Sequence, residues 1–174
     1  ASIQLAIENG VKCIEHGNGL DAPTAVRMVE LGITMVPTLI AYKALDEIGP
    51  KVVFPESMLA KNNGVFEMGQ NAVEIAKSAG VELGFGTDLL GEGHHLQNEE
   101  FAIRANLEPA ADVLRSMYVT NVKLCQMEGE IGTVTAGAYA DLVVSRVNPL
   151  EDLAGLSEPD ANLSSIIMQG EPVR

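Results

Sequence analysis

The chain contains no tryptophan, and Phe and Tyr make up only 4% of its 174 residues. Aromatic faces on which nucleic-acid bases could stack are therefore scarce. Basic residues are also few, because 11 Lys and Arg stand against 24 Asp and Glu and give a formal net charge of −13. A charge of this sign opposes binding to nucleic acid and to anionic membranes. We therefore expect no nucleic-acid partner and no membrane partner.

Long hydrophobic runs and cysteine motifs are missing as well. The longest apolar run lies around Ile33–Tyr42 and is interrupted by Pro37, whereas a transmembrane helix needs about 20 apolar residues. The chain does not open with a basic segment followed by an apolar one, so the sequence predicts no secretory signal. Cys13 and Cys125 have no metal-binding spacing, and we expect them to be buried thiols in a reducing compartment. The predicted location is the cytoplasm.

Strand-like and helical segments alternate through the first half of the chain. Asp21 has the position of an N-cap, and Gly32 has that of a helix stop, so a helix is predicted between them. A second helical region is predicted over Met58–Ala79, interrupted at Asn62-Asn63-Gly64 and ending before Gly80. The segment 40–55 is predicted to be irregular because of its prolines and glycine. This alternation predicts parallel strands with crossover helices. The three strand-like runs are Val11–Ile14, Ile33–Leu39 and Val81–Thr87.

The second half changes character at Gly129. Helices are predicted over Glu99–Asn106 and Pro109–Leu124, the second with proline at its first turn. After Gly129 the sequence is rich in β-branched residues and turns, and Ile166–Pro172 has the pattern of a hairpin. We predict an antiparallel β layer here. The domains expected are residues 1–128 and residues 129–174.

Polar residues follow two of the strand-like runs at their ends. Asp88 comes after Val81–Thr87, and His16 follows Val11–Ile14 with only Glu15 between. A (β/α)₈ barrel of about 250 residues has about 31 residues per βα unit. His16 and Asp88 lie roughly two such units apart, so both are expected at the same catalytic rim. An imidazole and a carboxylate suit zinc, but two ligands are fewer than the usual three. The alternatives are a cap or turn role for Asp88 and a hydrogen-bonded rim role for His16.

Three further residues are candidates for substrate binding. Tyr42 follows the middle strand and can either reach a substrate oxygen or pack in the core. His94 and His95 are adjacent, so their side chains point apart and do not chelate one metal together. Either can line the substrate mouth or lie on an exposed loop. Gly86 is expected to permit close packing, because the chain has no nucleotide-binding fingerprint.

The ordered motifs resemble those of a known family. The resemblance is to the C-terminal half of the amidohydrolase superfamily, in its imidazolonepropionase-like and Xaa-Pro dipeptidase-like branch. It covers essentially the whole chain. The motifs are Ile14-Glu15-His16-Gly17, Val36-Pro37-Thr38-Leu39, Gly86-Thr87-Asp88, Thr120-Asn121, Gly129-Glu130-Ile131-Gly132-Thr133-Val134, Gly137-Ala138-Tyr139-Ala140-Asp141-Leu142-Val143-Val144 and Asn148-Pro149-Leu150.

This resemblance implies a fold and a set of roles. The fold is α/β, a partial (β/α)₈ TIM barrel (about strands six to eight) followed by part of a small antiparallel β-sandwich. His16 matches the metal-binding histidine that ends the sixth strand. Asp88 matches the aspartate that ends the eighth strand, where it binds metal and serves as general base. The loop His94–Phe101 is similar to one that shapes substrate binding in the peptidase-like members. The implied cofactor is zinc, as one or two ions.

The family's His-x-His pair, its carboxylated lysine and its fifth-strand histidine are absent from the sequence. We therefore expect the chain to be a fragment whose exposed faces are covered in a homo-oligomer or by a missing N-terminal segment. The first functional hypothesis is a zinc-dependent hydrolase of C–N bonds, with a dipeptide or other small molecule as substrate. A cyclic amide hydrolase or a deaminase is an alternative within this class. The second hypothesis is a catalytically inactive interaction module.

Overall fold

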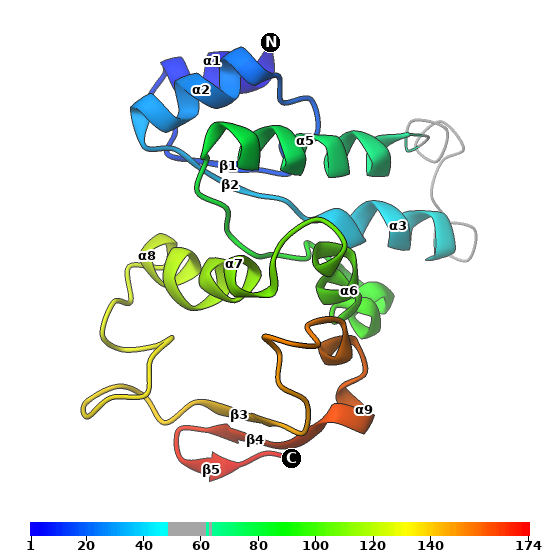
Figure 1. Ribbon diagram of the computed structural model, residues 1–174, viewed down its shortest axis with the longest axis vertical. Coiled ribbons are helices and arrows are strands. Elements are labelled where there is room, and N and C mark those ends of the chain that lie inside the picture. Colours follow the sequence, from blue (N-terminus) through cyan, green and yellow to red (C-terminus); the bar gives the residue numbers. More distant parts are fainter. Residues whose placement is uncertain (49–61, 63) are drawn as a thin grey trace. The chain divides into compact units, whose positions relative to one another are not determined.

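A computed structural model describes residues 1–48, 62 and 64–174. The chain divides into two compact units, Ala1–Glu100 and Phe101–Arg174. Figure 1 labels the helices and strands of both units. Within the described residues, no helix has the length and apolar character needed to cross a bilayer.

The first unit alternates helices with short strands. Asp21 caps α2, because its Oδ1 accepts the Thr24 N–H at 2.8 Å. Gly32 ends that helix in the left-handed conformation, with φ of 62°, so both predicted boundaries are confirmed. The elements of this unit are α1 (Ser2–Glu8), β1 (Cys13–Glu15), α2 (Ala22–Leu31), β2 (Thr34–Val36), α3 (Leu39–Ile48), α5 (Val65–Ala79) and the 3-10 helix η1 (Gly91–Leu96).

The strands of the first unit are parallel, as the sequence predicted. β1 pairs with β2 in parallel register, with Ile14 opposite Met35. Leu83 forms a parallel bridge to Met35 on the other side of β2. The prediction of a regular strand over residues 81–87 is wrong, because pairing is limited to this bridge. Glycine weakens a strand, and the ladder ends at Gly84, whose N–H donates to the Met35 carbonyl at 2.8 Å.

Helices α2, α3 and α5 pack into the core of this unit, and α5 lies alongside α2 and α3 in Figure 1. Their buried residues include Met28, Val73 and Ala76. The predicted irregular segment 40–55 is wrong in its first part, because α3 occupies it up to Ile48 and its remainder lies outside the described residues. The predicted helix before Gly80 is confirmed over α5, and most of its earlier residues also lie outside the described ranges.

The second unit contains a helical run that confirms the predicted helix over 109–124. Its three consecutive parts are α7 (Ala110–Arg115), the π-helical η2 (Ser116–Thr120) and α8 (Asn121–Leu124). A Cβ placed on Gly132 would lie 2.6 Å from the Tyr118 carbonyl oxygen, so only glycine allows this approach to η2. Helix α6 (Glu99–Ala105) confirms the other helix expected in this half.

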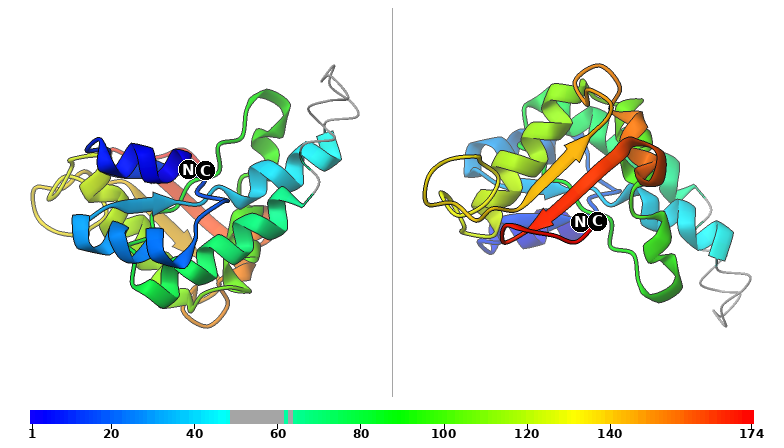
Figure 2. Two further views of the ribbon diagram at one scale, coloured as in Figure 1. Left: turned by 90° about the horizontal axis from the view of Figure 1, so that it is seen from above. Right: turned by 90° about the horizontal axis from the view of Figure 1, so that it is seen from below.

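An antiparallel sheet of order β3–β4–β5 follows, and Figure 2 shows β3 and β4 as arrows running in opposite directions. The β4–β5 hairpin turns at Gln169 and Gly170, both at positive φ, which suits a two-residue turn. The predicted hairpin is thus confirmed, whereas residues 129–141 are mostly turns. The remaining elements are β3 (Leu142–Ser145), η3 (Ala154–Ser157), α9 (Pro159–Asn162), β4 (Leu163–Met168) and β5 (Glu171–Pro172).

Candidate active site

His16 occupies a tight turn at the end of β1. Its N–H donates to the Val36 carbonyl at 2.9 Å and so extends the pairing with β2 by one residue. The Gly17 N–H then donates back to the Glu15 carbonyl at 2.9 Å, which closes a three-residue turn around His16. The φ of His16 is 69°, close to the value of the rare, strained γ-turn. The strand therefore stops at His16, and the turn fixes the direction of its side chain.

The His16 ring is held through one nitrogen. Its Nδ1 lies 2.6 Å from Thr38 Oγ1, and Thr38 follows β2 and is only 3% exposed. A hydrogen bond to one ring nitrogen sets the tautomer and orientation of an imidazole. Nε2 is left as the ring nitrogen that faces Asp88.

Asp88 approaches His16 from the chain segment that passes the other side of β2. The distance from Asp88 Oδ2 to His16 Nε2 is 3.7 Å, and the two side chains are 54% and 42% exposed. This separation is too long for a hydrogen bond. Two ligand atoms of one tetrahedral zinc, each about 2.1 Å from the metal, lie roughly 3.4 Å apart. The pair thus has a spacing that suits a shared ion.

The donor set fits zinc only in part. Imidazole nitrogen and carboxylate oxygen are both zinc ligands, and a catalytic zinc usually takes three protein ligands. In the ranges that the structure describes, no group of three or more His, Cys, Asp or Glu side chains could hold a metal ion. His16 and Asp88 would therefore be two ligands of such a site, and the others would come from further residues.

Tyr42 lies on the first turn of α3, next to the histidine. Its ring meets the His16 ring edge-on, with centroids 6.0 Å apart and an interplanar angle of 73°. Burial raises the pKa of the Tyr42 hydroxyl, a hydrogen bond with Asn18 lowers it, and the Asp88 charge raises it further, with a net upward shift. The hydroxyl is therefore protonated at neutral pH. Three of the five predicted site residues thus form one cluster.

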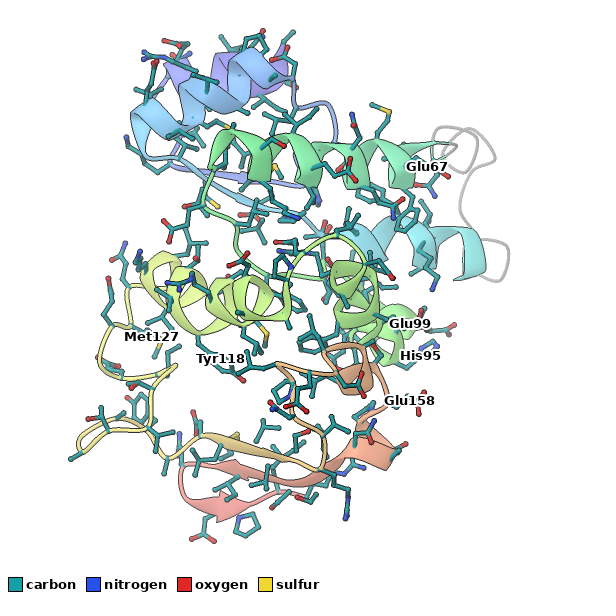
Figure 3. The ribbon with its side chains drawn as sticks, in the orientation of Figure 1. Glu67, His95, Glu99, Tyr118, Met127 and Glu158 are labelled. Carbon is teal, nitrogen blue, oxygen red and sulfur yellow. The ribbon has the colours of Figure 1, made fainter. Side chains whose placement is uncertain are left out.

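The other two predicted residues lie on η1. His94 and His95 are both exposed, and His95 Nδ1 lies 2.6 Å from the Glu92 carbonyl oxygen. Figure 3 labels His95 and Glu99, which lie at the junction of η1 and α6. Among the described residues, no hydrogen bond or ring contact joins either histidine to the cluster of His16, Asp88 and Tyr42.

Sequence reasoning missed three residues around this cluster. Thr38 holds His16, Asn18 lowers the pKa of the Tyr42 hydroxyl, and Glu100 binds the start of α3. Thr38 had a usable signal, because it follows a predicted strand just as His16 and Asp88 do. Gly86 meets its expectation of close packing, since a Cβ there would lie 2.9 Å from Val36 Cγ1.

The two cysteines differ from the prediction of buried thiols. Cys125 is exposed, and Cys13 is partly buried. The Cys13 Sγ donates to Glu15 Oε1 at 3.1 Å. Burial, followed by the hydrogen bond and charge of Glu15, raises the pKa of the Cys13 thiol to about 12. A thiol with so high a pKa is a poor nucleophile and a poor metal ligand at neutral pH.

A separate hollow of about 380 Å³ lies between α2 and α5. Its lining contains none of the predicted site residues, and Glu74 is its single titratable side chain. Catalytic sites usually combine a cavity with several convergent polar groups. We therefore place the candidate site at the cluster of His16, Asp88 and Tyr42 and not in this hollow.

Comparison with known proteins gives consistent matches over nearly the whole chain. A model of the amidohydrolase family matches residues 1–173. The structure of a prolidase in complex with N-methylphosphonate-L-proline is 39% identical, with a TM-score of 0.93, and the match covers 99% of this chain and 42% of that one. A Xaa-Pro dipeptidase with methionine bound in its active site is 29% identical, with a TM-score of 0.84, over 99% of this chain and 42% of that chain.

A curated relative extends the comparison to a fungal enzyme. Ochratoxinase of Aspergillus niger is 27% identical over 162 residues, which make up 92% of this chain and 34% of that protein. The chain thus spans less than half the length of the relatives that it matches.

Proposed function

Because the chain belongs to the amidohydrolase family, we propose that it is part of a metal-dependent hydrolase that cleaves amide bonds in Xaa-Pro dipeptides or closely related small molecules. The likeness to a prolidase in complex with N-methylphosphonate-L-proline supports the substrate class. The observation that carries the proposal is the 3.7 Å approach of His16 Nε2 to Asp88 Oδ2. Both groups are ligand types for zinc.

In this proposal the chain's own residues hold the metal and move the proton. His16 binds through Nε2, and its Nδ1–H donates to Thr38 Oγ1, so Thr38 fixes the tautomer. When bound, zinc would polarise the amide carbonyl and lower the pKa of a water molecule towards neutrality. Asp88 accepts the proton from that water at a carboxylate oxygen and passes it to the leaving amine.

Tyr42, His94 and His95 bind substrate in this proposal. The Tyr42 hydroxyl is protonated at neutral pH and lies within the field of Asp88, so it can donate a hydrogen bond to a substrate oxygen. His94 and His95 are exposed on η1, which suits side chains that contact the outer part of a ligand. Loops at strand ends supply such contacts in barrel enzymes.

The proposed architecture assigns residues 1–128 to part of a (β/α)₈ barrel and residues 129–174 to part of a flanking β-sandwich. Parallel pairing of β1 with β2, and of Leu83 with Met35, supports the barrel assignment. The antiparallel order β3–β4–β5 supports the sandwich assignment.

The test is proline release from a panel of Xaa-Pro dipeptides by the full-length protein, before and after metal removal by a chelator. We expect turnover that is lost on chelation and restored by zinc. Asp88→Asn should reduce kcat by at least about a hundredfold, the usual effect of losing a general base. Undiminished turnover in Asp88→Asn, in protein that is correctly folded, would exclude the assigned role of Asp88.

A second candidate is a non-catalytic interaction module. It is favoured by one observation: in the described ranges no third ligand joins His16 and Asp88. Elemental analysis of the purified 174-residue chain and of the full-length protein separates the two. Stoichiometric zinc in the full-length protein supports the hydrolase, and its absence from both proteins supports the module.

A further inference from the structure

The start of α3 is capped in an unusual way. Thr38 directly precedes the helix, where a threonine hydroxyl normally accepts one of the first unpaired backbone N–H groups. Here the Thr38 hydroxyl lies 2.6 Å from His16 Nδ1 instead. The Thr38 carbonyl still accepts the Ala41 N–H, at 3.2 Å. The hydroxyl expected to cap this helix thus contacts His16, the candidate metal ligand.

A carboxylate from a distant part of the chain takes the place of the cap. The Ile40 N–H donates to Glu100 Oε2 at 2.7 Å, and Ile40 and Glu100 are both fully buried. Burying a carboxylate is costly unless it is well hydrogen-bonded. The N-terminus of a helix offers both N–H donors and a favourable dipole for an anion. The Glu100 carboxyl group therefore lies where the start of α3 offers an N–H donor and a dipole that favours an acceptor oxygen.

We propose that Glu100 is a positioning residue, which caps α3 in place of Thr38 and so leaves the Thr38 hydroxyl to hold His16. The proposal rests on the proposed function in one respect: a fixed orientation of the His16 ring matters because His16 is a proposed metal ligand. Glu100 touches neither substrate nor metal in this scheme. It acts on the site through α3, which also carries Tyr42.

A purely structural role as a tether between α6 and α3 does not account for Glu100. Its neighbour Glu99 already links the same two helices, through an ion pair with Lys43 at 2.7 Å. That pair is exposed to solvent, and surface ion pairs contribute little to stability. Glu100 instead binds the backbone N–H of Ile40, two residues after Thr38, which contacts His16, so we expect its loss to affect the geometry of the site.

The experiment uses full-length protein without substrate. Hydrogen exchange at the Ile40 amide reports the cap, and the side-chain ¹⁵N shifts of His16 in ¹⁵N-histidine-labelled protein report its tautomer. The variants are Glu100→Ala, Glu100→Gln, Thr38→Val and, as the matched control on the same helix, Glu99→Ala.

We expect Glu100→Ala to accelerate Ile40 exchange at least about tenfold, since hydrogen bonds to charged groups contribute about 1.5–3 kcal/mol. The same variant should shift the His16 tautomer away from the wild type. Glu100→Gln retains an acceptor oxygen and should rescue both readouts, and Glu99→Ala should change neither. Thr38→Val should alter the His16 tautomer while the Ile40 amide stays protected.

Two results would overturn the proposal. The first is loss of Ile40 protection in Thr38→Val, which would make Thr38 the cap. The second is loss of Ile40 protection or of the wild-type tautomer in Glu100→Gln. If Glu100→Ala does not fold, these two variants decide the question alone. All readouts are independent of turnover, so a failure of the proposed hydrolase activity would be seen separately.

Discussion

His16 and Asp88 are both held at positive φ, 69° and 50°, at the point where their side-chain atoms come within 3.7 Å of each other. Non-glycine residues in this region cost about 1–3 kcal/mol each and persist only where surrounding structure imposes them. Two such positions, on different segments and facing one another, indicate that the fold accepts local strain to bring these side chains together.

The first prediction concerns the strain at His16. Glycine adopts a φ near 69° without steric cost, whereas alanine does not. We therefore expect His16→Gly to be more stable than His16→Ala by about 1 kcal/mol in chemical denaturation. The control pair is Glu74→Gly and Glu74→Ala on the exposed face of α5. There the alanine variant should be the more stable by about 1 kcal/mol, because alanine favours a helix more than glycine does. Equal stability of the two His16 variants would mean that the turn is not strained.

The second prediction concerns metal binding. Removing either ligand from a shared site should lower zinc content, so His16→Gly and Asp88→Asn should each bind zinc at least about tenfold more weakly than the wild type. Competition with a chromogenic chelator measures this affinity in the full-length protein. Asp160→Asn is the control, since the Asp160 side chain is fully exposed and pairs with Arg174 in the second unit. Wild-type affinity in both site variants would remove His16 and Asp88 from the metal site.

The third prediction concerns Gly86. A Cβ at this position would lie 2.9 Å from Val36 Cγ1, and Val36 is buried and stiff at χ1 because it is β-branched. Gly86→Ala should therefore destabilise the protein by about 1–3 kcal/mol, as overpacking does. Gly19→Ala is the matched control, because a Cβ there meets nothing within 4 Å. Similar stability for the two variants in denaturant unfolding would contradict the packing argument.

The fourth prediction concerns acid stability at Asp21. Hydrogen bonds with Thr24 lower the pKa of the Asp21 carboxyl below its ordinary value. A lowered folded-state pKa means that the stabilisation is present above the unfolded pKa of about 3.9, and is lost as the pH falls through the folded-state pKa.

Asn caps a helix about as well as Asp but does not titrate. The melting temperature of Asp21→Asn should therefore fall less than that of the wild type as the pH is lowered from about 5 to about 3. An identical pH profile for the two proteins would show that the Asp21 cap does not contribute to acid unfolding.

The features that the sequence predicts correctly have local causes. Helix α2 follows from a side-chain cap at Asp21 and a left-handed stop at Gly32, both readable within a dozen residues. The β4–β5 hairpin follows from Gln169-Gly170 in the same way. His16 and Asp88 could be singled out because each is a polar residue after an apolar run.

The features that were missed depend on distant parts of the chain. Helix α3 begins directly after Thr38, but the Thr38 hydroxyl contacts His16, and the Ile40 N–H is satisfied by Glu100, sixty residues further on. The contacts at the start of this helix are therefore not local. The predicted strand over 81–87 forms only the bridge to Met35 on β2, a pairing that depends on a segment almost fifty residues earlier in the chain. The role of Thr38 was missed for the same reason, because its partner His16 follows β1, 22 residues earlier in the chain.

The difference between the two thiols allows selective chemical labelling of the protein at one cysteine. Maleimides and related reagents attack the thiolate, and Cys13, with its pKa of about 12, supplies almost none of it at neutral pH. Cys125 is exposed and belongs to the second unit, whereas His16, Asp88 and Tyr42 belong to the first. A single fluorophore or spin label can thus be attached to this part of the chain at Cys125 without removing any cysteine.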